Sequence, residues 1–310
     1  MLDVRRLRLL VELSRRGTLA AVAEALSYSP SSVSQQLAQL EREAGVPLLV
    51  QAGRRVQLTP QALVLVEHGI AVLDRLEEAE AEVARSLTAV GGTVRLAVFQ
   101  SAAHAVVPQA LTLLAAEHPA LRVEVTEREP EAGLFEVAAR DFDLVLAEQY
   151  PGHTRQHRPE LDRVPLVADP IRLALPGDIP APVAPARADA TLADAASLPW
   201  VLEPAGTASR EWAVQLCREA GFEPDVRFET ADLIAHIRLI RAGHAAGLLP
   251  DLVWAGEPPS VRLAELPGRP QREVFTATRH AAATRPAVVA CRDALARAAR
   301  AATPAPRPAG

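Results

Sequence analysis

The chain has 310 residues, 49% of them apolar and 23% charged, which is enough for about two globular domains with sizeable cores. It contains no run of about eighteen apolar residues and no cleavable signal peptide, so we expect no membrane span and a cytoplasmic location. The net charge of -5 is unevenly distributed, because residues 1–58 carry eight arginines and five acidic residues, a net charge of +3. A basic end on an acidic body is expected where only that end meets nucleic-acid phosphate.

The cysteines and histidines are not spaced as metal ligands. Cys217 and Cys291 lie far apart and belong to no CxxC pair, so we interpret them as buried free thiols in a reducing compartment. His153 and His157 are four residues apart, a spacing that suits a metal only on a helix, and glycine and proline flank them here. A surface loop is the favoured interpretation, and the sequence predicts no metal site and no cofactor.

The first predicted element is a helix over residues 2–15. It ends at Gly17, as helices often do at a glycine, and Thr18 then caps a second amphipathic helix. A Tyr-Ser-Pro sequence interrupts the helical pattern and starts a third helix. Ser29 is placed to cap this helix, and Pro30 fits its first turn, where a missing N–H costs little.

The third helix has a distinctive polar face. Val33, Leu37 and Leu40 fall on one side of it, while the other side carries serine and glutamine. The uncharged polar residues are Ser31, Ser32, Ser34, Gln35, Gln36 and Gln39. Such side chains can read base edges in a major groove, whereas an ordinary solvated helix face favours charged residues. A helix, a tight turn and a polar-faced helix therefore predict DNA binding, in preference to the alternative of a plain helical bundle.

A small hairpin is predicted next, within residues 48–58. Polar and apolar residues alternate toward its end as in a strand, and Gly53 marks the turn. Arg54 and Arg55 lie at the tip, where they are placed to act as a wing against the DNA backbone. A solvated arginine pair in a loop is the alternative, and the neighbouring recognition helix favours the wing.

A long helix begins at Thr59-Pro60 and continues to residue 88, a length of roughly 45 Å at 1.5 Å per residue. Apolar residues recur along it at helical spacing, and no companion stripe of matching length lies nearby in the sequence. The residues assigned to this stripe are Leu63, Val66, Ile70, Leu73, Leu76 and Val83. Pairing with a second copy of the chain is the simplest way to bury the stripe, so we predict a homodimer joined through this helix. The opposite face is acidic and should avoid phosphate.

From residue 93 onward, strands alternate with helices. Strands are predicted at residues 93–99, 121–127, 142–148, 171–177, 199–203, 226–230, 246–249 and 272–279. Helices are predicted at residues 108–117, 131–140, 209–220, 231–242 and 285–301. The first three strands belong to a βαβαβ run, which implies a parallel sheet with right-handed crossovers. Two α/β lobes joined by two crossings would form a hinged domain with a ligand cleft between them.

The predicted fold is therefore a mainly α N-terminal winged helix-turn-helix, a long linker helix and a two-lobed α/β domain. The predicted boundaries are 1–58 for the winged unit, 59–90 for the linker, 91–302 for the α/β domain and 303–310 for a disordered tail. Within the α/β domain, lobe I is assigned to about 91–165 and 267–302, and lobe II to about 166–266.

This order of elements resembles the LysR-type transcriptional regulators over the whole chain. The N-terminal residues that carry the resemblance are Arg8 to Leu13, Gly17-Thr18, Ala25-Leu26, Ser29, Val33-Ser34, Gln36-Leu37, Leu40-Glu41, Gly45 to Leu48, Gly53 to Val56 and Leu58 to Pro60. The C-terminal residues are Gly92, His118-Pro119, Asp143-Leu144, Pro199-Trp200, Ala220 to Phe222 and Ala242 to Pro250. The resemblance implies an effector-binding domain similar to periplasmic binding proteins. It also implies homotetramers on partly palindromic double-stranded DNA near a promoter, which makes RNA polymerase a candidate partner.

The DNA-contacting residues are expected on the third helix and the hairpin. Gln35 and Gln36 are the first candidates for base contacts, and the serines of the same helix come next. The full expected set is Thr18, Ser29, Ser31, Ser32, Ser34, Gln35, Gln36, Gln39, Arg54 and Arg55. The two arginines would position the wing on phosphate or in the minor groove.

A small-molecule effector is expected between the lobes, at helix starts that follow strands, where free N–H groups favour an anion. Gln100, Ser101 and Ala102 follow the first strand, in lobe I. The corresponding residues of lobe II are Gly206, Thr207, Ala208 and Thr230. Plain helix capping explains Ser101 and Thr207 equally well.

Two other classes of function are alternatives to a regulator. One is a cytoplasmic ligand carrier resembling solute-binding proteins, and the missing signal peptide and the Ser/Gln helix face count against it. The other is an enzyme on the two-lobed fold. The sequence has no nucleophile elbow, no His-Glu-x-x-His motif and no glycine-rich phosphate loop, so no catalytic residues are predicted.

Overall fold

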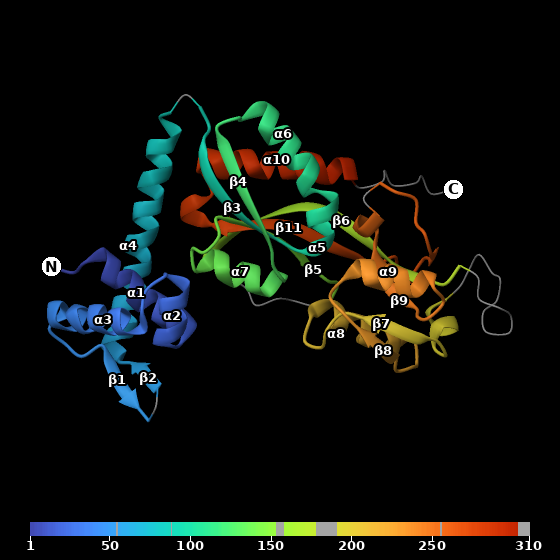
Figure 1. The fold of residues 1–310 in the computed structure, drawn as a ribbon, viewed down its shortest axis with the longest axis horizontal. Coiled ribbons are helices and arrows are strands. Elements are labelled where there is room, and N and C mark those ends of the chain that lie inside the picture. Colours follow the sequence, from blue (N-terminus) through green and yellow to red (C-terminus); the bar gives the residue numbers. More distant parts are fainter. Residues whose placement is uncertain (54, 88, 153–157, 178–190, 255, 303–310) are drawn as a thin grey trace.

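The computed structural model describes residues 1–310 except 54, 88, 153–157, 178–190, 255 and 303–310. Figure 1 shows three parts in chain order: a small unit of helices and a hairpin, the long helix α4, and a larger α/β body. The expectations for Arg54, for the pair His153 and His157, and for the tail lie outside the described residues. Among the helices that the structure describes, none is both long enough and apolar enough to cross a lipid bilayer.

The N-terminal unit is built from elements whose starts are set by side-chain caps. The elements are α1 (Val4–Arg16), α2 (Leu19–Ala25), α3 (Pro30–Ala44), β1 (Leu49–Ala52) and β2 (Arg55–Leu58). Side-chain oxygens of Asp3, Thr18 and Ser29 accept backbone N–H groups that otherwise lack a partner at the three helix starts. Gly17 and Gly45 end α1 and α3 with φ angles of 76° and 71°, which cost glycine little. The predicted helix-turn-helix is confirmed.

The core of this unit includes the start of α4 (Pro60–Arg85). Val33 and Leu37 of α3 are buried in the same cluster as residues of α1 and α4. Helices α1 and α4 approach each other closely at Gly69, where an added Cβ would lie 3.0 Å from Cγ2 of Val11. The first half of α4 is therefore a structural part of the N-terminal unit rather than a free linker.

The α/β body contains one large mixed sheet and a small two-stranded sheet. The strands are β3 (Gly92–Val98), β4 (Leu121–Glu127), β5 (Leu144–Gln149), β6 (Leu161–Leu175), β7 (Pro199–Leu202), β8 (Asp225–Glu229), β9 (Gly247–Pro250), β10 (Arg262–Ala264) and β11 (Gln271–Arg279). The large sheet has the order β10-β6-β11-β5-β3-β4, with β9 also paired to β6. β3 pairs in parallel with both β4 and β5, as the βαβαβ pattern predicts, and β7 pairs in parallel with β8.

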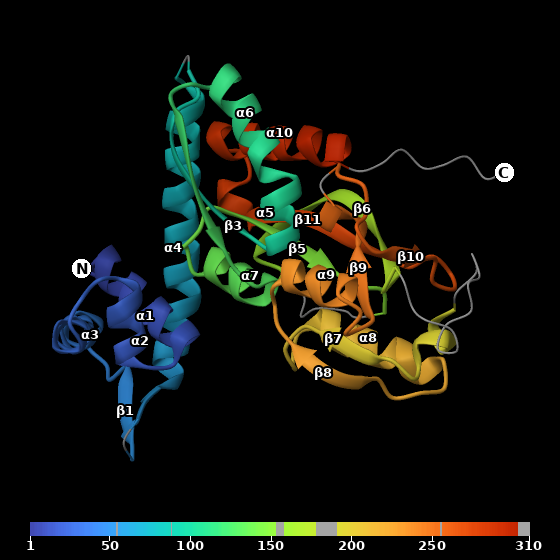
Figure 2. The same cartoon turned by 45° about the vertical axis from the view of Figure 1, so that its right-hand side comes forward.

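Helices cover both faces of the strands in lobe I. The helices of the body are α5 (Gln100–Ala105), α6 (Val107–Glu117), α7 (Pro130–Ala138), α8 (Ala208–Glu219), α9 (Leu233–Arg241) and α10 (Pro286–Ala302). Alternate residues of β3 and β5 point to opposite faces, so one set packs on α5, α6 and α10 while the other packs on α7 (Figure 2). In lobe II, α8 and α9 pack on β6, β7 and β9.

Strand β6 differs from the sequence prediction. We expected a strand at 171–177, whereas β6 begins at Leu161 and runs for 15 residues across the predicted boundary between the lobes. Pro165 and Pro170 argue against a strand in the sequence, because proline donates no hydrogen bond to a ladder. Their partners Phe275 and Gln271 lie on β11, and the ladder shifts register next to Phe275, which accommodates one proline at an irregularity.

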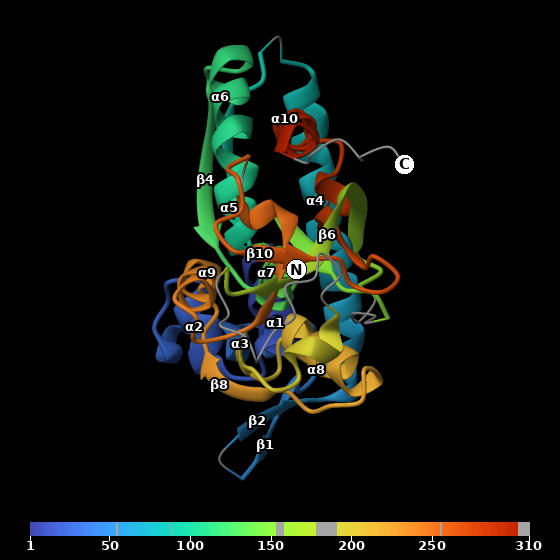
Figure 3. The same cartoon turned by 90° about the vertical axis from the view of Figure 1, so that its right-hand side faces the viewer.

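The helix α4 also contacts lobe I. Figure 3, in which α10 is seen nearly end-on, shows α4 running along the side of the α/β body. It packs against α10 and against the short helical turn η3 (His280–Ala282). The winged unit, the linker helix and lobe I therefore form one connected assembly within a single chain.

Candidate functional site

The exposed face of α3 carries part of the predicted polar set. Ser31, Ser34 and Gln35 are exposed, whereas Ser32 is half-buried. The Ser29 hydroxyl accepts the backbone N–H of Ser32 at 3.1 Å and lies 3.0 Å from the hydroxyl of Ser31. Ser29 therefore acts as the helix cap, while Ser31, Ser34 and Gln35 remain available at the surface.

The other two glutamines of α3 are engaged within the protein. The Arg6 guanidinium donates to the Gln36 side-chain oxygen at 2.8 Å, which ties this residue to α1. The Gln39 oxygen accepts from Nε of Arg42 at 3.0 Å, and its amide donates to Glu43 at 3.4 Å. Sequence spacing alone places Gln35 and Gln36 together, but the fold gives them different surroundings.

The hairpin β1–β2 projects from the N-terminal unit, away from the α/β body (Figure 1). Gly53 occupies the turn with a φ of 63°, next to the exposed Ala52. Arg55 begins β2 and pairs with Ala52 across the hairpin. Thr18 lies at the start of α2, where its hydroxyl accepts the N–H of Ala21 at 3.2 Å. The hairpin thus has the shape expected of a wing.

The predicted apolar stripe of α4 divides between two faces. Val66 is buried in its own chain, and Ile70 and Leu73 pack against the same core, so these residues serve the winged unit. This differs from the expectation that one stripe faces a partner, because α1 already covers that side. Leu76 and Val83 are 47% and 66% exposed. The remaining exposed apolar residues of the helix region are Leu63, Val64, Val72 and Leu87.

The acidic residues of α4 include two that contact lobe I. Arg279 donates to both carboxylate oxygens of Glu77, at 2.9 Å from Nε and 2.6 Å from a terminal nitrogen. Arg140 pairs with Asp74. Arg16, at the end of α1, donates to Asp141 at 2.6 Å. The sequence pattern predicts that this acidic face avoids phosphate, and the structure shows that these charges join the linker and the winged unit to lobe I.

The lobe I effector candidates do not share one environment. Ala102 is fully buried in the hydrophobic core, and Ser101 is 1% exposed, so neither lines an open cleft as expected. Gln100 instead bridges the lobes: its amide donates to Asp232 at 3.3 Å, and its oxygen accepts the N–H of Leu233 at 2.8 Å. The N-terminus of α9 is therefore closed by a side chain from α5.

A buried arginine that no sequence pattern indicates lies at the junction of the lobes. Arg272 is 2% exposed and donates to Asp169 at 2.8 Å, to Ser101 at 2.6 Å and to Glu148. Burial alone would lower the pKa of Arg272, but the adjacent Glu148 and Asp169 carboxylates raise it, so the charge is retained. Burial raises the pKa of Asp169, against the opposing effect of Arg272. A local sequence motif cannot indicate this network, because Ser101, Glu148 and Asp169 are each more than 100 residues away from Arg272 in the sequence.

The lobe II effector candidates act mainly as caps and turns. The Thr207 hydroxyl donates to the Pro204 carbonyl at 2.9 Å and accepts the N–H of Arg210 at 3.3 Å, which is the capping alternative. Thr230 accepts the N–H of Asp232 at 3.1 Å through its hydroxyl. Gly206 is exposed with a φ of 89° in the turn before α8, which Ala208 begins.

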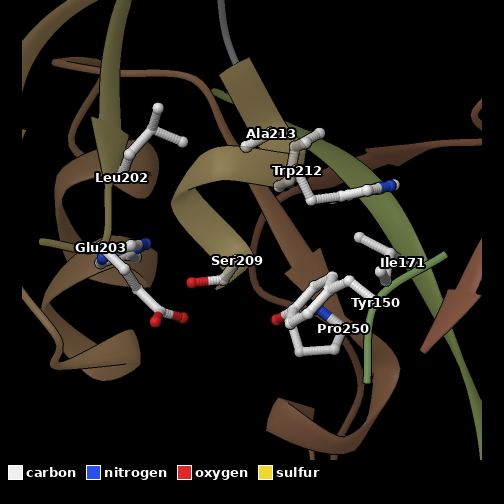
Figure 4. Close-up of a pocket in the computed structure, with 10 residues that line it drawn as sticks. Tyr150, Ile171, Leu202, Glu203, Ser209, Trp212, Ala213 and Pro250 are labelled. Atoms are coloured by element: carbon white, nitrogen blue, oxygen red, sulfur yellow. The ribbon is translucent and has the colours of Figure 1, made fainter. Parts of the chain in front are cut away.

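A small cavity lies beside these caps, between the end of β5, α8 and α9 (Figure 4). Its polar lining comes from Tyr150, Glu203, Ser209 and His236, and Trp212 contributes an aromatic wall. The free volume is about 20 Å³, room for roughly one water molecule. Burial raises the pKa of Glu203 to about 7, with Glu148 adding to the effect and the Ser209 hydroxyl opposing it. Within the described residues, no three His, Cys, Asp or Glu side chains are arranged to hold a metal ion.

Comparisons with known proteins agree with this division into two functional parts. The family model described as "Bacterial regulatory helix-turn-helix protein, lysR family" matches residues 4–63, and "LysR substrate binding domain" matches residues 88–300. The transcriptional dual regulator GltC of Bacillus subtilis is 28% identical over 258 residues, 83% of this chain and 84% of that protein. A probable hydrogen peroxide-inducible genes activator of Mycobacterium avium is 30% identical over 246 residues, 79% of this chain and 76% of that protein.

Solved structures share the whole architecture. A full-length OxyR variant from Pseudomonas aeruginosa superimposes with a TM-score of 0.66 at 18% identity, covering 97% of this chain and 95% of that chain. Full-length CbnR in complex with its target DNA gives a TM-score of 0.53 at 22% identity, covering 96% of this chain and 100% of that chain. The likeness extends from the winged unit through the linker helix to both lobes.

Proposed function

We infer that this chain, which belongs to the LysR family of transcriptional regulators, reads its DNA site chiefly through Ser31, Ser34 and Gln35 of α3. The family membership makes the protein a DNA-binding regulator with an effector-binding domain, and not an enzyme. The observation that carries the finer proposal is the exposed, uncharged polar face of α3. Side chains of this kind form bidentate and single hydrogen bonds to base edges in the major groove. The hairpin then contacts the phosphate backbone as a wing.

Genomic-fragment selection with the purified full-length protein at one stated salt concentration tests this function. We expect a few fragments to be enriched and to share a partly palindromic sequence, because two recognition helices lie about one DNA turn apart in such dimers. Binding that is absent, or that ignores sequence, both alone and with candidate effectors, would favour the ligand-carrier alternative.

Gln35→Ala is expected to reduce the preference for the selected site by about 1–3 kcal/mol, roughly fivefold to 150-fold, because one bidentate base contact is lost. The measurement is competition between the selected duplex and a scrambled duplex at fixed salt. Gln39→Ala is the matched control, since the Gln39 side chain bonds to Arg42 and Glu43 of its own helix. Equal effects of the two substitutions, or no effect of Gln35→Ala, would show that Gln35 does not read bases.

The proposed oligomer is a dimer through the exposed face of α4, assembled into tetramers as the family resemblance implies. Support comes from the run of exposed apolar side chains on α4, since such a run is normally buried by a partner. A regulator of this kind works on chromosomal DNA, so we place it in the cytoplasm, with RNA polymerase as a candidate contact at the promoter.

Peroxide sensing through thiol oxidation is not proposed for this chain, although a relative is described as a peroxide-inducible activator. Cys217 and Cys291 are both buried, in different core clusters. Burial raises the pKa of each thiol to about 12, so neither forms the accessible thiolate that peroxide attacks.

Hydrogen peroxide is therefore expected to leave DNA affinity unchanged and both thiols reduced in the native protein. The measurement is DNA binding before and after treatment, followed by thiol titration in denaturant. The double substitution Cys217→Ser and Cys291→Ser is the control, and it should respond to peroxide in the same way as the unaltered protein. A peroxide response that disappears in the double variant would contradict this expectation.

A further inference from the structure

The small cavity next to α8 has a lining that selects for hydrogen-bond donors. Glu203 lines it with a carboxyl group, and Ser209 places a hydroxyl on the same side, as Figure 4 shows. Nε2 of His236 lies 2.7 Å from the Thr230 carbonyl, so Nε2 carries the proton and Nδ1 presents a lone pair. The His236 side chain is only 2% exposed, and its Nδ1 atom is buried and makes no hydrogen bond in the structure. A buried acceptor without a donor costs free energy, which a ligand N–H would recover.

The arginines nearest to Glu203 are both engaged by other groups. Arg272 is shared by two carboxylates, those of Glu148 and Asp169, so this network carries one excess negative charge. Arg210 donates to the backbone carbonyl of Glu203 at 3.2 Å, and its guanidinium lies 3.8 Å from the Glu229 carboxylate. The titratable or charged groups facing Glu203 are Glu129, Glu148, Tyr150, Arg210, His236 and Arg272. The two carboxylates and the two arginines of this set cancel, and both arginines are already paired with carboxylates, so neither is available to hold an anionic ligand.

The apolar part of the cavity suits a cation as well. The Tyr150 and Trp212 rings lie 5.5 Å apart between centroids and are tilted by 36°. Aromatic faces attract ammonium groups through their quadrupole, most strongly where water is excluded. Ile171, Leu248 and Pro250 complete the apolar wall of the cavity, whose volume of about 20 Å³ suits a group the size of an ammonium ion.

We propose that this cavity binds the ammonium group of a small primary amine, and that such an amine is the effector of this regulator. The proposal rests on the proposed regulatory function and names the ligand class of its effector domain. The ammonium would donate to the Glu203 carboxylate and to Nδ1 of His236, beside the Tyr150 and Trp212 rings. It replaces the expectation of an anion, which was based on helix N-termini alone. In the structure, Gln100 occupies the start of α9.

Binding of alkylammonium ions to the full-length protein tests the proposal. The probes are ammonium, methylammonium, ethylammonium, propylammonium and butylammonium chlorides, with sodium acetate and ethanol as anionic and neutral comparisons at constant ionic strength. Calorimetry and tryptophan fluorescence report binding, and Trp212 is itself part of the cavity wall. We expect at least one ammonium ion to bind at least tenfold more tightly than acetate or ethanol.

The pH dependence gives a second readout that needs no variant. The pKa of Glu203 is raised to about 7, so its carboxyl group is largely protonated at pH 6 and ionised at pH 8. Below pH 7, the affinity for an ammonium ion that pairs with the carboxylate should rise by up to about tenfold for each unit by which the pH increases. Above pH 8, the affinity should level off. A flat profile, or one that falls as pH rises, would overturn the pairing.

Glu203→Gln keeps the size of the side chain and removes its charge, so it should weaken ammonium binding at least tenfold and flatten the pH profile. Glu219→Gln, at an exposed position of α8, is the matched control and should change neither. Ammonium binding that is unaffected by Glu203→Gln, preferred binding of acetate, or no binding of any ammonium ion would each refute the proposal. Selective DNA binding is measured on the same preparations, so loss of the regulatory function itself would be recognised separately.

Discussion

Arg272→Met is expected to destabilise the α/β body by about 3–5 kcal/mol, because it removes one partner from a buried ion pair. The substitution leaves the Glu148 and Asp169 carboxylates buried without the guanidinium that they share. Methionine keeps most of the side-chain volume, so the loss reports charge rather than a cavity. The measurement is urea unfolding followed by circular dichroism, with the midpoint compared at pH 7.

The pH dependence of this variant has a defined sign. Without Arg272, the Asp169 carboxylate loses the charge that opposes the effect of burial, so its folded-state pKa should lie further above its unfolded value. The unfolded state then releases protons more readily, so the variant should lose stability as pH rises and recover part of it as pH falls through the raised pKa of Asp169.

Arg297→Ala is the control for Arg272→Met. Arg297 donates two hydrogen bonds to the carboxylate of Glu117, and these two side chains are 34% and 43% exposed. A pair at the surface is screened by water and contributes little to stability, so the control should shift the midpoint little. Similar losses for the two variants would mean that the Arg272 network is not buried in solution.

Leu76→Glu combined with Val83→Glu is expected to weaken self-association at least about 100-fold, since charges placed in an apolar interface are costly to desolvate. Both side chains are exposed within one chain, so the fold should survive while the proposed dimer does not. Affinity for a palindromic DNA site should fall together with self-association, because a monomer binds only one half-site.

Analytical ultracentrifugation and DNA binding on the same samples measure this effect. The control is Val164→Glu, which introduces the same chemistry at a 40% exposed position of β6 in the α/β body. The dimerisation role of α4 would be excluded by a double variant that sediments and binds DNA like the unaltered protein.

The elements that could be predicted are those with local signals. Ser29 caps α3, Thr59 caps α4 and Gly17 ends α1, and each of these residues acts within one turn of its own position. The polar face of α3 could be found for the same reason, because helical spacing alone separates it from Val33 and Leu37.

The features that could not be predicted depend on contacts between distant segments. Val66 was assigned to a partner, but α1 covers it in the same chain. Gln36 shares a helix face with Gln35, yet Arg6 from α1 binds it. Ser101 follows a strand as a ligand-contacting residue would, but it bonds to Arg272 from a strand 171 residues away in the sequence. Hydrophobic periodicity and capping residues give no information about contacts with segments that are distant in the sequence.

The ion pairs of Arg16, Arg140 and Arg279 couple the orientation of lobe I to that of the linker helix and the winged unit. They attach lobe I to α4 near its middle and to the end of α1, so a rotation of lobe I must turn the winged unit as well. Since α4 has 26 residues, it is about 39 Å long. Asp74 lies 14 residues from the start of the helix at Pro60, about 21 Å, so a tilt of about 10° about this point displaces that start by roughly 4 Å, about one base-pair step of 3.4 Å. A small adjustment in the body is thus enough to carry a recognition helix out of register with its half-site.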